Sequence, residues 1–154
     1  MAILIQNQLR RRVARTLLRR AVDETLRAEG RAPRTVEVSI ALVDDAAITA
    51  LNSQYRGQPG PTDVLAFAQD DTPAAPGVPV LLGDIVIALD TAAAQAASHR
   101  RTLDEEVCWL AIHGTLHLLG YDDATAEGFA EMVRKGTRIW ERLFPDAAPP
   151  THGA

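Results

Sequence analysis

The chain has 154 residues, with 47% hydrophobic and 23% charged side chains, a formal net charge of −4 and one cysteine. This composition is typical of one globular domain that buries its own core, and it argues against disorder, a disulfide framework and a thiolate metal cluster. Because the sequence shows neither a secretory signal at its start nor an apolar run long enough to span a membrane, we expect a cytoplasmic protein without a membrane partner.

The first predicted elements are a strand at residues 2–6 and a helix at residues 8–29. Residues 2–6 form a short apolar run with branched side chains, which is typical of a strand. Apolar residues then recur at the spacing of one helix face until Gly30, a residue type that commonly ends a helix.

The predicted helix at residues 8–29 is strongly basic. Residues 1–34 contain nine arginines and three acidic residues, a net charge of +6, whereas the rest of the chain has a net charge of −10. Fixed cations displace the counterions condensed on nucleic acid, so this segment suits a phosphate-rich partner. An arginine-rich helix surface that meets only solvent accounts for the same pattern equally well. If the segment binds RNA, the predicted contacts are Arg10, Arg11, Arg15 and Arg19.

The middle of the chain is predicted to contain three strands and one helix. Residues 35–43 alternate apolar and polar side chains, which is the period of a half-buried strand. The other predicted elements are a helix at 46–55, strands at 63–67 and 82–89, and proline- and glycine-rich loops at 56–61 and 69–80. We expect the last two strands to pair as a hairpin across the loop at 69–80.

Three helices follow, at residues 91–99, 103–119 and 124–144, with Gly120 between the last two. Strands early in the chain and helices late indicate an α+β fold, with a small four-stranded mixed sheet packed with about five helices. We predict a single domain at residues 1–144 and a disordered tail at residues 145–154.

Two histidines on the predicted helix at residues 103–119 have the spacing of metal ligands. His117 follows His113 by four positions, so both imidazoles leave the helix in the same direction from adjacent turns. Gly120 can adopt the left-handed conformation that ends a helix and turns the chain back. That turn brings Asp123 beside the histidines as a third ligand, with Asp122 as the alternative.

Three protein ligands leave one position of a tetrahedral zinc ion free for water, and this distinguishes a catalytic zinc site from a structural one. The alternative is that both histidines are ordinary core residues of an apolar helix. Zinc proteases share the spacing H-x-x-x-H-x-x-G-x-x-H/D, but they carry a glutamate directly after the first histidine as the general base. Here that position is Gly114, which makes peptide hydrolysis the weaker hypothesis.

These residues resemble the signature of the YbeY family of rRNA-maturation endoribonucleases, H-G-x-L-H-L-x-G-Y-D-H. The matching residues are His113, Gly114, Leu116, His117, Leu118, Gly120, Tyr121 and Asp122. Two upstream stretches also match: Asn52, Tyr55, Arg56 and residues 61–67 resemble N-x-x-Y-R…P-T-D-V-L-S-F, and residues 82–87 resemble L-G-D-I-x-I. The resemblance covers most of the chain, to about Phe144.

The chain departs from the family at its third histidine, which is Asp123 here. A carboxylate is an acceptable zinc ligand, so we predict one Zn²⁺ per chain, held by His113, His117 and Asp123. Two histidines and a carboxylate also form the ligand set of non-haem iron enzymes, so iron and manganese are alternatives.

The resemblance implies a zinc-dependent, single-strand-specific endoribonuclease that acts in rRNA maturation, including processing of the 16S 3′ end, and in ribosome quality control. It implies that Arg56 lies in the cleft facing the metal, where a guanidinium can contact two oxygens of a phosphate, and that Arg56 and His113 are catalytic. The implied partners are rRNA and the small ribosomal subunit, with ribosomal proteins or GTPase assembly factors as further candidates. Two alternatives stay open: a zinc peptidase-like hydrolase, and a metal-stabilised ribosome assembly factor that does not cut RNA.

Overall fold

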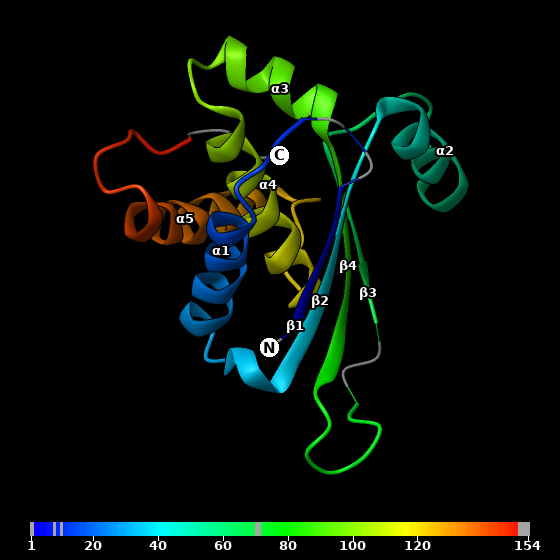
Figure 1. The fold of residues 1–154 in the computed structure, drawn as a ribbon, viewed down its shortest axis with the longest axis vertical. Helices are drawn as coiled ribbons and strands as arrows, with labels where there is room; N and C mark the ends of the chain where they lie inside the picture. The colour runs from blue at the N-terminus through cyan, green and yellow to red at the C-terminus, as the bar shows by residue number, and fades with distance from the viewer. Residues whose placement is uncertain (1, 8, 10, 70–71, 151–154) are drawn as a thin grey trace.

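The computed structural model describes residues 2–7, 9, 11–69 and 72–150 (Figure 1). In chain order its elements are β1 (Ala2–Asn7), α1 (Arg15–Ala28), the 3-10 turn η1 (Pro33–Thr35), β2 (Val36–Val43), α2 (Asp45–Arg56), β3 (Val64–Ala68), β4 (Val80–Ala88), α3 (Leu89–Ser98), α4 (Leu103–Leu118) and α5 (Ala126–Leu143). This is the predicted α+β fold, with a four-stranded mixed sheet and five α-helices among the described residues.

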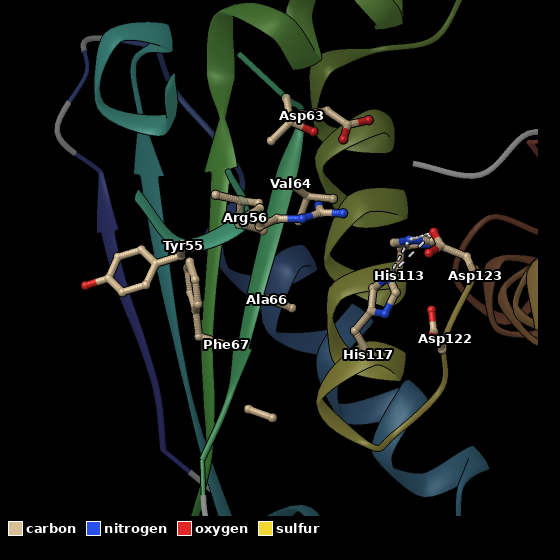
Figure 2. Close-up of a pocket in the computed structure, with 13 residues that line it drawn as sticks. Tyr55, Arg56, Asp63, Val64, Ala66, Phe67, His113, His117, Asp122 and Asp123 are labelled. Atoms are coloured by element: carbon tan, nitrogen blue, oxygen red, sulfur yellow. Dashed lines mark hydrogen bonds and ion pairs between the residues drawn. The ribbon is translucent and has the colours of Figure 1, made fainter. Parts of the chain in front are cut away.

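The sheet has the strand order β1-β2-β4-β3. Strands β1, β2 and β4 are parallel, while β3 runs antiparallel to β4, with Val64 opposite Ile87 and Ala68 opposite Gly83. The predicted hairpin of the third and fourth strands is therefore confirmed. Because β3 pairs only with β4, it forms one edge of the sheet, and this edge faces the histidines described below (Figure 2).

Helices cover the two faces of the sheet unequally. Helices α1, α3, α4 and α5 lie together on one side, and α2 lies on the other side near one end (Figure 1). On the first side, Leu18 of α1 and Leu110 of α4 belong to one buried apolar cluster with Ile40 and Ile85 of the sheet. Ile48 of α2 belongs to a smaller cluster on the opposite face. Helix α4 thus lies between the sheet and the outer helices, which holds it firmly in place.

The first helix is seven residues shorter at its start than the sequence predicts, since α1 begins at Arg15 rather than at residue 8. The side chain of Asn7 accepts a hydrogen bond from the Leu9 N–H at 3.0 Å and donates one to the Arg11 carbonyl at 2.8 Å. These bonds hold the segment before α1 in a non-helical conformation. Leu9 and Val13 still pack against the core, which explains why they match the helical pattern.

Two observations concern the predictions about membrane spans and about the C-terminal tail. Among the described residues, no helix combines the length and the apolar character that crossing a bilayer demands. The indole N–H of Trp140 donates a hydrogen bond to the Ala147 carbonyl at 3.3 Å, and Pro150 is buried. The predicted domain boundary after residue 144 and the disordered tail stay predictions.

Candidate metal centre

Helix α4 presents two imidazoles on one side, as the sequence predicts. A capping box fixes the start of this helix, because the Thr102 hydroxyl accepts from the Glu105 N–H and the Glu105 carboxylate accepts from the Thr102 N–H. One turn separates His113 from His117 near the other end, and their Nε2 atoms lie 2.9 Å apart. Both rings therefore direct the same nitrogen atom toward one point.

A carboxylate joins the two imidazoles after the chain reverses. Gly120 has a φ of 101°, a left-handed conformation that favours glycine, and the chain then returns past the end of α4. Asp123 Oδ2 lies 3.3 Å from His113 Nε2 and 3.7 Å from His117 Nε2. Asp122, the alternative ligand, instead accepts a hydrogen bond from the Ala124 N–H at 2.8 Å. His113, His117 and Asp123 could thus hold a metal ion, with ligand atoms within 4.8 Å of one another.

The three donor atoms fit a tetrahedral ion. Bonds of about 2.0–2.1 Å to nitrogen and oxygen require donor atoms about 3.3 Å apart, and the separations here are 2.9, 3.3 and 3.7 Å. His117 Nδ1 lies 2.9 Å from the Tyr121 carbonyl, so this nitrogen is the one that donates and Nε2 keeps its lone pair. Burial, and next the neighbouring His117, lower the pKa of His113 to about 4, although Asp123 opposes this shift. His113 is therefore neutral near pH 7, which is the form that binds metal.

The three donors lie in a cleft of about 660 Å³. Helix α4 and the turn at residues 122–123 form one wall, and the edge strand β3 forms the other, together with Tyr55 and Arg56 (Figure 2). The guanidinium of Arg56 extends past β3 toward His113 (Figure 2). The aromatic rings of Tyr55 and Phe67 lie beyond β3 and pack edge to face, with centroids 5.3 Å apart.

Arg56 reaches the cleft because of how α2 ends and how the chain then returns. It is the last residue of α2, and the loop that follows leads directly into β3. The buried Asn52 side chain donates from Nδ2 to the Gly60 carbonyl at 3.1 Å, which ties this loop to the helix. Sequence reasoning gave Asn52 no role, although its place in a matched motif was a usable signal. At the entry to β3, Asp63 accepts a hydrogen bond from Gln95 at 3.2 Å.

Of the arginines predicted to bind RNA, the three that the structure describes do not line this cleft. Arg15 and Arg19 are exposed on α1, and Arg11 forms an ion pair with Asp90 at 2.9 Å. Arg10 lies outside the described residues. Any contact between this basic surface and RNA would therefore involve nucleotides other than those inside the cleft.

Gly114 packs directly against the sheet. A Cβ atom built at this position would lie 2.9 Å from Ile85 Cγ2, closer than real Cβ atoms approach their neighbours. A side chain at position 114 would thus meet β4 rather than enter the cleft. The absence of a protease-type glutamate after His113 therefore has a physical cause in the packing of α4 on β4.

Other residues considered from the sequence are part of the core. Cys108 is buried, and this burial raises the pKa of its thiol to about 12, which makes it a poor metal ligand or nucleophile. Trp109 and Trp140 are also buried, and their rings meet edge to face with centroids 6.2 Å apart. Neither indole is available to stack on a base.

Two imidazoles and one carboxylate that converge at an open cleft are typical of single-metal hydrolases. Comparison with known proteins gives the family. The chain belongs to the family described as Endoribonuclease YbeY, whose model matches residues 4–144.

Individual relatives agree with this assignment. The chain is 48% identical over 129 residues to an Endoribonuclease YbeY of Pelotomaculum thermopropionicum, covering 82% of this chain and 84% of the relative. It is 50% identical over 128 residues to an Endoribonuclease YbeY of Moorella thermoacetica, with 79% and 81% covered. The solution structure of TM1509 from Thermotoga maritima is similar with a TM-score of 0.63 and 28% identity, over 94% of this chain and 91% of that one. The predicted family, enzyme class and fold are thereby confirmed.

Proposed function

We propose that this chain is a metal-dependent endoribonuclease that cleaves single-stranded RNA during rRNA maturation, including the 16S 3′ end, and in ribosome quality control. One observation carries the proposal: His113, His117 and Asp123 converge in a cleft that Arg56 enters, in a chain of the Endoribonuclease YbeY family. We propose one Zn²⁺ per chain, with iron or manganese as alternatives, because the donor set is two imidazoles and a carboxylate.

In this proposal the metal ligands and Arg56 have separate roles. A metal ion bound here would supply a Lewis acid and lower the pKa of a bound water molecule. His113, the most buried of the three residues, would hold the ion together with His117 and Asp123. Arg56 binds the scissile phosphate with two parallel N–H donors and stabilises the negative charge that develops during cleavage. These are the roles in which we propose His113 and Arg56 as catalytic residues.

The size of the cleft supports single-strand specificity. Its volume of about 660 Å³ is in the range of pockets that hold small molecules, so we propose that it admits an unpaired nucleotide and excludes a base-paired helix. RNA beyond the cleft would meet Arg15, Arg19 and the partly neutralised Arg11, and Arg10 belongs to the same proposal. We propose rRNA in the small ribosomal subunit as the cytoplasmic target, with ribosomal proteins or assembly GTPases as partners.

The test is RNA cleavage by the purified protein with single-stranded and hairpin rRNA fragments. We expect cleavage of unpaired segments, loss of cleavage with a chelator, and recovery when Zn²⁺ is added back. His117→Ala and Arg56→Ala are expected to abolish or strongly reduce cleavage, whereas Arg34→Ala, which removes an exposed arginine outside the cleft, leaves it unchanged. Cleavage that survives both the chelator and His117→Ala would contradict the proposal.

The place of the activity in rRNA maturation needs a cellular test. In bacteria depleted of their own family member, we expect the wild-type gene to restore the mature 16S 3′ end and the His117→Ala gene to fail. Complementation by a folded His117→Ala protein would instead indicate an assembly factor that does not cut RNA. Cleavage of a peptide library would indicate the peptidase alternative, which the packing of Gly114 on Ile85 disfavours.

A further inference from the structure

A three-residue cluster adjoins the turn that carries Asp123 and includes none of the candidate metal ligands. The Tyr121 hydroxyl donates a hydrogen bond to Glu29 Oε1, and Lys135 Nζ lies 3.2 Å from Glu29 Oε2. The same ammonium group lies 5.0 Å from the centroid of the Tyr121 ring, within the range of a cation–π contact. Glu29, Tyr121 and Lys135, here called the Tyr121 anchor, thus bring together the end of α1, the α4–α5 connection and α5.

The Tyr121 anchor is connected to the donor set through the tyrosine backbone. The Tyr121 carbonyl accepts from His117 Nδ1 at 2.9 Å, and the Tyr121 N–H donates to the Leu116 carbonyl at 3.1 Å. Two residues later the same turn carries Asp123. The position of Tyr121 therefore affects both the orientation of the His117 ring and the place of the third ligand.

Besides its hydrogen bonds, two contacts among the described residues restrain this turn: the Tyr121 ring packs against the buried cluster that includes Leu116 and Met132, and Gly128 of α5 lies against the Asp122 carbonyl. A Cβ atom at Gly120 would have no neighbour within 4 Å, and the hydrogen bond from the Ala124 N–H to Asp122 is local. Within the Tyr121 anchor the Glu29 side chain is 12% exposed and the Lys135 side chain 28%, so their ion pair is partly shielded from water and salt. The Tyr121 anchor adds a partly buried ion pair between helices to these contacts.

We infer that Glu29 and Lys135 are positioning residues of the metal site, which act by holding Tyr121 so that its carbonyl orients His117 and its turn presents Asp123. This inference rests on the metal binding in the proposed function, but not on the RNA substrate. Groups that orient a metal-bound histidine contribute about 10- to 100-fold to metal affinity. Both Glu29→Ala and Tyr121→Phe leave the Tyr121 carbonyl in place, so we expect them to weaken metal binding by about 10-fold, the lower end of this range.

The chain offers a matched control. Glu24 of α1 pairs with Arg142 of α5 at 3.7 Å, so this ion pair also links α1 to α5 but does not involve Tyr121. Glu24→Ala should therefore lower the stability of the metal-free protein without changing metal affinity by more than about twofold. The comparison separates loss of helix packing from loss of ligand positioning.

The experiment is a competition titration of metal-free protein with Zn²⁺ against a chromophoric chelator, accompanied by urea unfolding of each metal-free variant. The inference predicts weaker binding for Glu29→Ala and Tyr121→Phe than for Glu24→Ala at a similar loss of stability. Unchanged affinity in folded Glu29→Ala and Tyr121→Phe would overturn it and leave the anchor a structural feature only. If the wild type binds neither Zn²⁺ nor Mn²⁺ nor Fe²⁺, the proposed metal site fails together with this inference.

A second readout does not require metal. Long-range ¹H–¹⁵N correlation spectra of the metal-free protein report which nitrogen of His117 carries the proton. We expect the Nδ1–H form in the wild type and in Glu24→Ala, since Nδ1 faces the Tyr121 carbonyl. In Glu29→Ala we expect a mixture of the two forms. The same single form in all three proteins would contradict the inference.

Discussion

Substituting Gly114 by alanine tests how closely α4 packs on the sheet beneath the metal ligands. The new Cβ would lie 2.9 Å from Cγ2 of Ile85, and the Ile85 side chain is fully buried and branched at its own Cβ, so it has little room to move. Crowding of this kind in a packed core costs about 1–3 kcal/mol. Replacing a glycine inside a helix by alanine recovers about 0.5–1 kcal/mol. We therefore expect Gly114→Ala to lower the free energy of unfolding by about 1 kcal/mol, near the midpoint of a range of about 0–2.5 kcal/mol.

The assay is urea unfolding of the metal-free protein followed by circular dichroism. Ala130→Gly, at an exposed position inside α5, serves as a reference. Its loss of stability measures how much exchanging alanine and glycine in a helix changes the free energy of unfolding in this chain, with the opposite sign to Gly114→Ala. In the double variant with Ile85→Ala, the added methyl group enters the space left by isoleucine. We expect the combined loss of stability to be smaller than the sum of the two single losses.

Two results would refute this reasoning. The first is a Gly114→Ala protein that is more stable than the wild type by about as much as Ala130→Gly is less stable. The second is an additive double variant, which would mean that residues 114 and 85 do not crowd each other. Either result would also remove the physical reason for the missing protease-type glutamate.

Three further predictions concern buried groups. Burial lowers the pKa of His113 from 6.5 to about 4, so as the pH falls the unfolded metal-free chain binds a proton before the folded chain does. The free energy of unfolding of the wild type should therefore fall by about 3 kcal/mol from pH 6.5 to pH 4. Urea unfolding of His113→Gln should not show this loss. Burial raises the pKa of Glu106 although the neighbouring Arg101 opposes this shift, so the free energy of unfolding should decrease as the pH rises above 4.5. Between pH 5 and pH 8 the wild type should lose more stability than Glu106→Gln. Parallel plots of stability against pH for the two proteins would contradict this prediction. In Gly83→Ala the new Cβ would lie 2.2 Å from the Phe67 carbonyl oxygen. We therefore expect the free energy of unfolding to fall by about 3 kcal/mol or more. An unchanged midpoint of urea unfolding would be incompatible with this contact.

The fold could be predicted from the sequence wherever a periodic pattern coincided with burial. The alternation in residues 35–43 predicted β2, and turn-rich residues between two apolar runs predicted the β3–β4 hairpin. The start of α1 could not be predicted, because the apolar spacing of Leu9 and Val13 continues the helical pattern. The Asn7 side chain bonds to backbone groups ahead of the helix, and these bonds leave no trace in the periodicity.

The candidate metal site could be predicted because it is local. His113, His117 and Asp123 lie within eleven residues, so helix geometry and one turn suffice to bring them together. Arg56 could be placed near them only through the family resemblance, since its position depends on how β3 pairs at the sheet edge. Glu29 has no sequence signal at all, because its contact with Tyr121 joins residues 92 positions apart.

The candidate ligands are close together in the sequence, whereas the other groups of the cleft come from distant parts of the chain. This difference helps to explain why one ligand set serves different hydrolases. The three donors could hold a metal ion with one coordination site open, which a peptidase and a nuclease need equally. The groups that distinguish the two chemistries come from the rest of the fold. Gly114 lies flush on Ile85 and leaves no space for a protease-type base, while Arg56 brings a permanent positive charge across β3 into the cleft. A peptide bond offers that guanidinium no anionic group, whereas every phosphodiester does, so in the proposed function Arg56 would favour RNA where the three candidate ligands alone would not.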